Sequence, residues 1–183
     1  MATGKLILKG FGNPNGPREP ITCKVRIIRE DVEQLKKENK NPITPALMAV
    51  QPGECLVSEN FIPAQNKWLE VASALIQDAG GSSSHAVLWS QEQGIPCVYN
   101  IGGVQQEDGN IAHSAVEDLH DGQEIVVMGY THTEEYTKSS GVRGQDINYG
   151  GVYEHTQSTE PTLAEKMALI EKYKAKFKTQ KGA

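Results

Sequence analysis

The first half of the chain alternates short apolar runs with segments rich in turn-forming residues. The runs over 5–9, 22–30 and 54–60 contain the aliphatic and β-branched residues typical of strands. Gly, Pro and Asn dominate the segment after the first run, which predicts a loop. Residues 31–41 are charged and fit either a short exposed helix or a solvated linker, and the three prolines of 42–52 predict a loop with at most one helical turn.

The centre of the chain has the pattern of an α/β unit. Pro63 is suited to the first turn of a helix, and apolar residues follow it at helical spacing. Residues 74–81 then predict a short buried strand that ends in a glycine loop. Residues 84–94 predict a helix closed by Gly94, and 95–100 predict the next strand. A strand, a glycine loop, a helix and a strand in this order define an α/β unit.

The second half of the chain is harder to interpret from its pattern. Residues 119–129 predict a turn at Asp121-Gly122 that leads into a strand, and 152–156 predict a last strand. Between them, 130–151 are polar and glycine-rich without a clear period. We therefore predict a long loop or insertion there, centred on 130–149.

The tail, 158–183, has the pattern of an amphipathic helix. Thr162 and Glu165 fit a capping box at its start. One apolar stripe follows at spacings of three and four residues, made of Leu163, Met167, Ile170, Tyr173 and Phe177. The stripe can pack on the domain's own core, or it can dock a partner chain.

Composition narrows the class of protein. The 183 residues include 18 basic and 23 acidic ones, a net charge of −5, which argues against a nucleic-acid binder. No stretch approaches the roughly 20 apolar residues of a membrane span, and the first residues lack the apolar core of a signal peptide. The three cysteines, Cys23, Cys55 and Cys97, form no CxxC pair, so we expect neither a disulfide framework nor a metal site. The expected location is the cytoplasm.

The segment Asp78–His85 carries the clearest chemistry. It joins the predicted strand to the predicted helix, and the unpaired backbone N–H groups at a helix start favour an anion. Gly80 and Gly81 permit close approach of the backbone, and three hydroxyl groups follow on Ser82, Ser83 and Ser84. The residue types therefore suit a phosphate site with the imidazole of His85 beside it. A serine that merely caps the helix is the alternative interpretation.

The same segment resembles a known family. GGSSSHAVLWSQEQGIPCVYN is similar to the signature of the swivelling phosphohistidine domain of phosphoenolpyruvate-utilising enzymes, among them pyruvate phosphate dikinase, phosphoenolpyruvate synthase and phenylphosphate synthase. The resemblance covers about residues 5–154. The matching positions are Gly80, Gly81, Ser83, Ser84, His85, Ala86, Glu92, Gly94, Ile95, Pro96, Cys97 and Val98. The chain departs from the family pattern at Gln91, where an arginine is usual, at Tyr99-Asn100, and in the length of 130–149.

The resemblance implies an α/β fold, a swivelling β/β/α three-layer domain over 1–157, with the helical tail over 158–183. It implies that His85 is the phosphocarrier nucleophile and that Gly80, Gly81 and the three serines position the phosphate. Asp78 and Glu92 are candidates for orienting the imidazole, or are only solvated carboxylates beside the helix. The chain itself is expected to hold no metal or cofactor, because ATP and Mg²⁺ would belong to a partner.

The chain's length, read with the resemblance, implies a carrier subunit that is inactive alone. The expected partners are an ATP-grasp-type nucleotide-binding subunit and a subunit that holds the acceptor. Pyruvate, phenol or another hydroxylated or enolisable compound would be the acceptor. Residues 130–149 and the tail are candidate docking elements. The alternative function is a non-catalytic regulatory or anion-binding module with the same fold.

Overall fold

The computed structural model describes residues 3–29, 32–41, 45–109, 113–156, 167–168 and 170–171. The chain divides into one unit of 4–155 and another of 1–3 with 156–183. The described residues of the tail, at 167–168 and 170–171, are helical, and the rest of the predicted tail helix lies outside the described residues. The assignment of 1–157 and 158–183 to separate domains stays a prediction.

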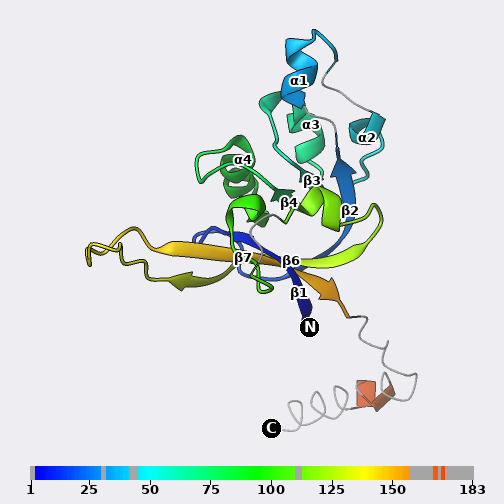
Figure 1. The fold of residues 1–183 in the computed structure, drawn as a ribbon. Helices are drawn as coiled ribbons and strands as arrows, with labels where there is room; N and C mark the ends of the chain where they lie inside the picture. The colour runs from blue at the N-terminus through cyan, green and yellow to red at the C-terminus, as the bar shows by residue number, and fades with distance from the viewer. Residues whose placement is uncertain are drawn as a thin grey trace. The chain divides into compact units, whose positions relative to one another are not determined.

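Seven strands of the larger unit form one mixed sheet in the order β1-β7-β6-β2-β3-β4-β5 (Figure 1). Strands β2 to β5 are parallel to one another, whereas β6 is antiparallel to both β2 and β7. The strands are β1 (Thr3–Phe11), β2 (Ile21–Ile28), β3 (Cys55–Ser58), β4 (Ala74–Gln77), β5 (Cys97–Val98), β6 (Glu124–Glu134) and β7 (Ile147–His155). This mixed sheet confirms the predicted α/β class.

The two edges of the sheet meet at one point. Phe11, the last residue of β1, pairs with Tyr99, the residue after β5, through backbone hydrogen bonds of 2.7 and 3.0 Å. Glycine makes this close approach possible. A Cβ atom on Gly10 would lie 2.6 Å from a side-chain carbon of Val98, and one on Gly12 would lie 2.3 Å from the carbonyl oxygen of Gly129. Gly10 near the end of β1 and Gly12 just after it therefore allow the two edges of the sheet to come together.

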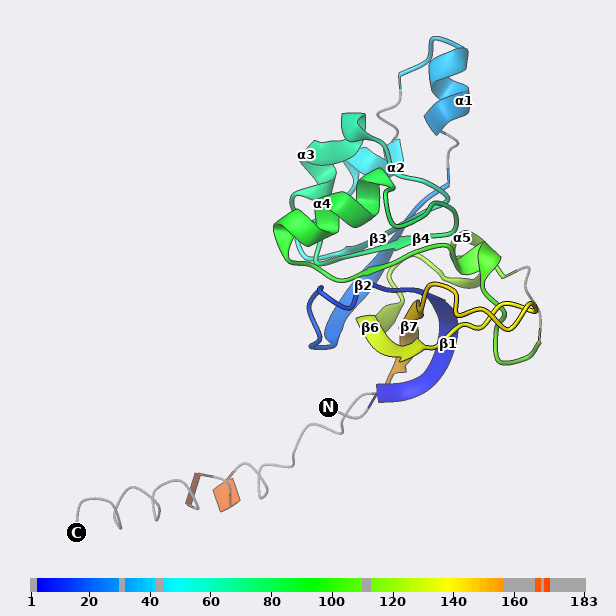
Figure 2. The same cartoon turned by 90° about the vertical axis from the view of Figure 1, so that its left-hand side faces the viewer.

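Among the described residues, five short helices and two 3₁₀ turns connect the strands. Figure 2 shows α3 and α4 over one face of the parallel strands. The helices are α1 (Val32–Lys37), α2 (Pro45–Met48), α3 (Asn66–Leu69), α4 (His85–Gln93) and α5 (Ala115–Asp118), and the 3₁₀ turns are Pro63–Gln65 and Ile101–Gly103. The single helical turn allowed within 42–52 is present as α2, and the helix predicted to open at Pro63 is present as a 3₁₀ turn that leads into α3.

The inner parallel strands β3 and β4 are buried on both faces. In β3, Cys55 and Val57 belong to a core shared with β2, β6 and β7, whereas Leu56 belongs to a second core shared with α3 and α4. The same alternation occurs in β4, where Leu75 faces the second core. Burial of such an aliphatic side chain stabilises the fold by about 1.5–3 kcal/mol. These strands lack polar alternation because both of their faces are covered.

The predicted long loop over 130–151 is wrong at both ends. Strand β6 continues to Glu134 and β7 already begins at Ile147, and the two pair antiparallel with His132 opposite Tyr149. The register shifts between Met128 and His132. Most side chains of 132–148 are exposed, so this end of the hairpin carries no apolar period that would mark it as strand. The hairpin projects from the sheet in Figure 1.

Candidate functional site

A buried glutamine, Gln77, holds the loop between β4 and α4 by hydrogen bonds. The side-chain amide of Gln77 donates to the carbonyl of Ala79 at 2.8 Å and to the hydroxyl of Ser84 at 3.3 Å. Gly80 has a φ of +85°, and a Cβ atom there would lie 2.2 Å from the Gln77 amide nitrogen. Gly80 is therefore required both by its left-handed backbone and by the space that Gln77 occupies. Sequence reasoning missed Gln77.

The side chain of Ser84 does not cap α4. Ser84 is the N-cap residue of α4, but its side chain makes no capping hydrogen bond. Its backbone N–H donates to the carbonyl of Gly81 at 2.9 Å, which closes the turn. Gly81, Ser82 and Ser83 are exposed. The capping alternative is thus not the arrangement observed, and the exposed loop can offer N–H and hydroxyl donors to an anion.

His85 is the first residue of α4 and is held by a residue that sequence reasoning missed. Its Nε2 lies 2.6 Å from Oδ1 of Asn66, the first residue of α3. Because a carbonyl oxygen only accepts, Nε2 carries a proton in this arrangement and Nδ1 is the unprotonated nitrogen. The ring of Trp89, one turn later on α4, lies 6.0 Å from the imidazole between ring centres.

Burial lowers the pKa of His85, and the negative charge of Glu92 opposes this effect. Glu92 is exposed on α4 and influences the imidazole through its charge. The imidazole is therefore neutral, and able to act as a nucleophile, at neutral pH.

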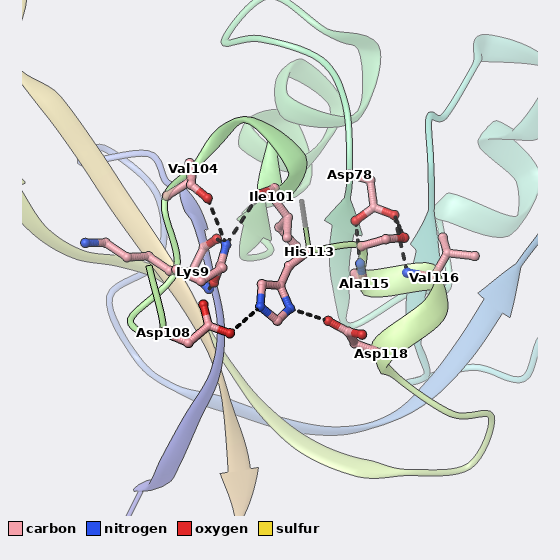
Figure 3. Close-up of polar contacts among 11 residues, drawn as sticks. Lys9, Asp78, Ile101, Val104, Asp108, His113, Ala115, Val116 and Asp118 are labelled. Carbon is pink, nitrogen blue, oxygen red and sulfur yellow. Dashed lines mark hydrogen bonds and ion pairs between the residues drawn. The ribbon is translucent and has the colours of Figure 1, made fainter. Parts of the chain in front are cut away.

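The carboxylate of Asp78 holds the start of α5. Its carboxylate accepts from the hydroxyl of Ser114 at 2.8 Å and from the backbone N–H groups of Ala115 and Val116 at 2.6 and 3.3 Å (Figure 3). These groups form the start of α5. The carboxylate of Asp78 thus fixes the segment that precedes the loop to α5, and its role in orienting the imidazole stays a prediction.

A second histidine, His113, lies two residues before α5 (Figure 3). His113 places Nδ1 at 2.6 Å from Asp118 and Nε2 at 2.9 Å from Asp108. Hydrogen bonds to Asp118 and then to Asp108 raise the pKa of His113, so this ring favours the protonated form. The ring thus bridges the two carboxylates. In the part of the chain that the structure describes, no group of three or more His, Cys, Asp and Glu side chains is arranged to hold a metal ion.

Replacing Asn66 by aspartate is expected to raise the pKa of His85. The new carboxylate would stand about as close to Nε2 as the amide oxygen does now, and a negative charge stabilises the imidazolium by roughly 1–3 pKa units at such range. The pKa is measured by NMR titration of the ring signals, with Asn60→Asp, a substitution elsewhere in the domain, as the matched control. An unchanged pKa in Asn66→Asp would show that the 2.6 Å contact is not made in solution.

The site and the fold together define a mixed α/β domain that presents a histidine at a helix start, behind an exposed loop of glycine and serine. Residues 50–132 match the family model of the PEP-utilising enzyme mobile domain. This match includes His85, its loop, Asn66 and Asp78. Over these residues the chain is therefore similar to the mobile domain of PEP-utilising enzymes.

Curated relatives agree with this assignment. The chain is 28% identical to phosphoenolpyruvate synthase of Helicobacter pylori over 79% of its own length and 15% of the relative. It is 31% identical to a probable phosphoenolpyruvate synthase of Methanothermobacter thermautotrophicus, over 56% of the chain and 13% of the relative. With phosphoenolpyruvate synthase of Escherichia coli the identity is 30%, over 51% of the chain and 12% of the relative. The chain thus spans a small part of the relatives it matches.

Among the described residues, no helix is long and apolar enough to cross a membrane.

Proposed function

We propose that this chain is a phosphohistidine carrier, in which His85 accepts a phosphoryl group at one site and delivers it at another. The observation that carries the proposal is the placement of His85. It begins the nine-residue helix α4, is held by Asn66 at 2.6 Å, and directly follows the exposed loop of Gly81, Ser82 and Ser83. The mobile-domain match over 50–132 supports the same function.

Phosphoryl transfer to and from His85 requires the carrier mainly to position the imidazole and the phosphoryl group. In the first step, an imidazole lone pair attacks the phosphorus of the donor and an N–P bond forms. The donor's P–O bond breaks, with its electron pair left on the donor oxygen. In the second step, an oxygen of the acceptor attacks phosphorus, and the N–P electron pair returns to the ring. The proton of the acceptor goes to a base of the acceptor site. Phosphoryl transfer depends mainly on alignment and on stabilisation of charge, which the loop's donors supply in part.

The donor and acceptor sites are assigned to partners. We propose an ATP-grasp-type nucleotide-binding subunit, which supplies ATP and Mg²⁺, and a second subunit that binds pyruvate or a hydroxylated or enolisable acceptor. The Helicobacter pylori relative is much longer than the segment that matches this chain, so that protein has room for other sites outside the segment. We also propose the finer β/β/α three-layer arrangement, supported by the alternation of β3 and β4 side chains between two cores.

The donor half of the proposal is tested by incubating the chain with radiolabelled ATP, Mg²⁺ and a co-purifying nucleotide-binding partner. The expected product is a label on this chain that is lost in acid and stable in base, as a phosphoramidate is. Addition of the acceptor should then discharge it. A chain that remains unlabelled with every partner that binds it would overturn the proposal.

The rate of phosphoryl uptake is expected to fall as the pH is lowered. The nucleophile is the neutral imidazole, and burial lowers the pKa of His85 below its ordinary value. The single-turnover rate should therefore be constant above about pH 7 and should fall about tenfold per pH unit below the lowered pKa. Rates are measured by rapid quench at saturating donor, with a stable partner. A rate that falls as the pH rises from 6 to 8 would contradict the assignment of a neutral nucleophile.

A further inference from the structure

Strand β1 lies at an edge of the sheet and directs part of its backbone outward. Among the described strands, β7 is the one neighbour of β1. Gly12, just after β1, donates its N–H to the carbonyl of Asn148 in β7 at 2.9 Å. Phe11 instead pairs with Tyr99, on the side away from β7. Because backbone N–H and C=O groups alternate between the two sides of a strand, the odd-numbered residues of β1 direct theirs away from β7.

The chain covers a part of this outward edge with the side chain of Gln106. The N–H of Lys9 donates to Oε1 of Gln106 at 2.7 Å, and the carbonyl of Lys9 accepts from Nε2 at 2.8 Å. The amide thus pairs with Lys9 as a neighbouring strand would. Among the described residues, none pairs with the outward backbone groups of Lys5 and Ile7. An uncovered edge of this kind is a template for pairing with another chain.

A groove runs along the uncovered stretch. Its main part is a pocket of about 350 Å³, lined by residues 5–7 of β1 and by Gln106, Glu107, Asp108 and His113. A smaller pocket of about 130 Å³ shares Leu6 and Glu107 with the first and continues along β1 to Lys9. The place of a neighbouring strand is therefore open beside 5–7 and occupied by Gln106 beside Lys9. A strand that binds here can form a short ladder at most.

The charges of the groove are self-complementary. Lys5 and Glu107 are exposed, and neither forms an ion pair within the part of the chain that the structure describes. Asp108, the other acidic residue of the lining, is bonded to His113 at 2.9 Å (Figure 3). One cation and one anion without partners thus lie in the same groove. Because a two-fold interface brings the same surface of both copies together, a surface with both signs can pair with itself.

We propose that this edge binds a second copy of the chain, whose own β1 pairs antiparallel with it about Leu6. In this register the outward backbone groups of Lys5 in each copy face those of Ile7 in the other. The side chain of Lys5 then reaches the groove of the other copy, where Glu107 lies. Since Gln106 already pairs with Lys9, the ladder does not extend further, and the contact closes as a dimer.

Helix α4 stays accessible in such a dimer. Figures 1 and 2 show β1 on one side of the parallel strands and α4 on the other. The dimer therefore presents two copies of His85 away from the shared edge. The inference does not rest on the carrier function, so the two can fail separately. A monomeric chain that takes up phosphate keeps the carrier function and overturns the dimer alone.

The edge is tested by hydrogen exchange of the full chain at rising protein concentration, with sedimentation velocity as the measure of dimer. The amides of Lys5 and Ile7 should exchange fast in the monomer and become protected as the dimer forms. The amides of Leu6 and Leu8, which face β7, should be protected throughout. A chain that is monomeric at about 1 mM, where even a weak contact is populated, would overturn the proposal. So would protection of Lys5 and Ile7 in the monomer, because another segment of the same chain would then cover the edge.

Charge reversal tests the choice of a second copy as the occupant. Lys5→Glu and Glu107→Lys should each weaken the dimer about tenfold, because each places like charges across the interface. An equimolar mixture of the two variants should recover the dimer, since opposite charges meet again. Lys138→Glu, an exposed change outside both pockets, is the matched control and should dimerise as the native chain does. Equal dimerisation of Lys5→Glu and Lys138→Glu, or no recovery in the mixture, would overturn the proposal.

Discussion

A His85→Gln variant is expected to take up no phosphoryl group from any donor that labels the native chain. Glutamine has an N–H that can still donate to the amide oxygen of Asn66, now 2.6 Å from Nε2, so the local contact can persist. It has no basic lone pair on nitrogen, since the amide nitrogen is conjugated. The substitution therefore removes the nucleophile with little change in shape. Labelling at a fixed time should fall below detection, and the free energy of unfolding should change by less than about 1 kcal/mol.

His120→Gln is the matched control for this prediction. His120 is exposed and lies in the turn before β6, so its replacement should leave both labelling and stability unchanged. Acid-labile label that persists in His85→Gln would place the phosphoryl group on another residue.

An Asp78→Ala variant is expected to show the largest loss of stability among the polar substitutions considered. The carboxylate accepts from two backbone N–H groups and a hydroxyl at the start of α5, at 2.6, 3.3 and 2.8 Å. Hydrogen bonds to a charged group contribute about 1.5–3 kcal/mol each, and loss of a helix cap alone costs about 0.5–2 kcal/mol. Because these bonds act as one unit, we expect a loss of about 2–4 kcal/mol in the free energy of unfolding by urea.

Two comparisons make the Asp78 prediction specific. Asp78→Asn keeps one acceptor oxygen and should lose less than Asp78→Ala. Glu92→Ala removes an exposed carboxylate from α4 and should change stability by less than about 0.5 kcal/mol. Equal losses in Asp78→Ala and Glu92→Ala would show that the contacts with α5 contribute nothing.

The sequence predicted well those features of the site that depend on neighbouring residues, namely the start and the end of α4. Gly94 ends α4 with a left-handed φ of 69°, and Ser84 with His85 marks the start of that helix, as expected. Turn and cap residues act on their immediate neighbours, so their effect can be read from a short window of sequence. The strand before the loop was predicted for the same reason, because a run of apolar residues between turn signals has few other solutions.

The contacts that were missed are made by polar side chains. Asn66 reaches His85 from a different helix, Gln77 supports the loop from inside the sheet, and Asp78 binds the start of α5 at 114–116. No pattern of hydrophobic spacing reports such polar pairs, because they depend on which elements the sheet brings together. The β6–β7 hairpin was missed for a related reason. Its outer part is held by backbone pairing rather than by an apolar face, so the periodicity that identifies a half-buried strand is missing.

The central claim, that His85 carries the phosphoryl group, is tested most directly by ³¹P NMR of the labelled native chain. We predict a phosphoramidate signal that disappears on acidification, persists in base, and is missing from His85→Gln prepared in the same way. An acid-stable phosphate ester on a loop serine such as Ser83, or a phosphoramidate signal that remains in His85→Gln, would contradict the account.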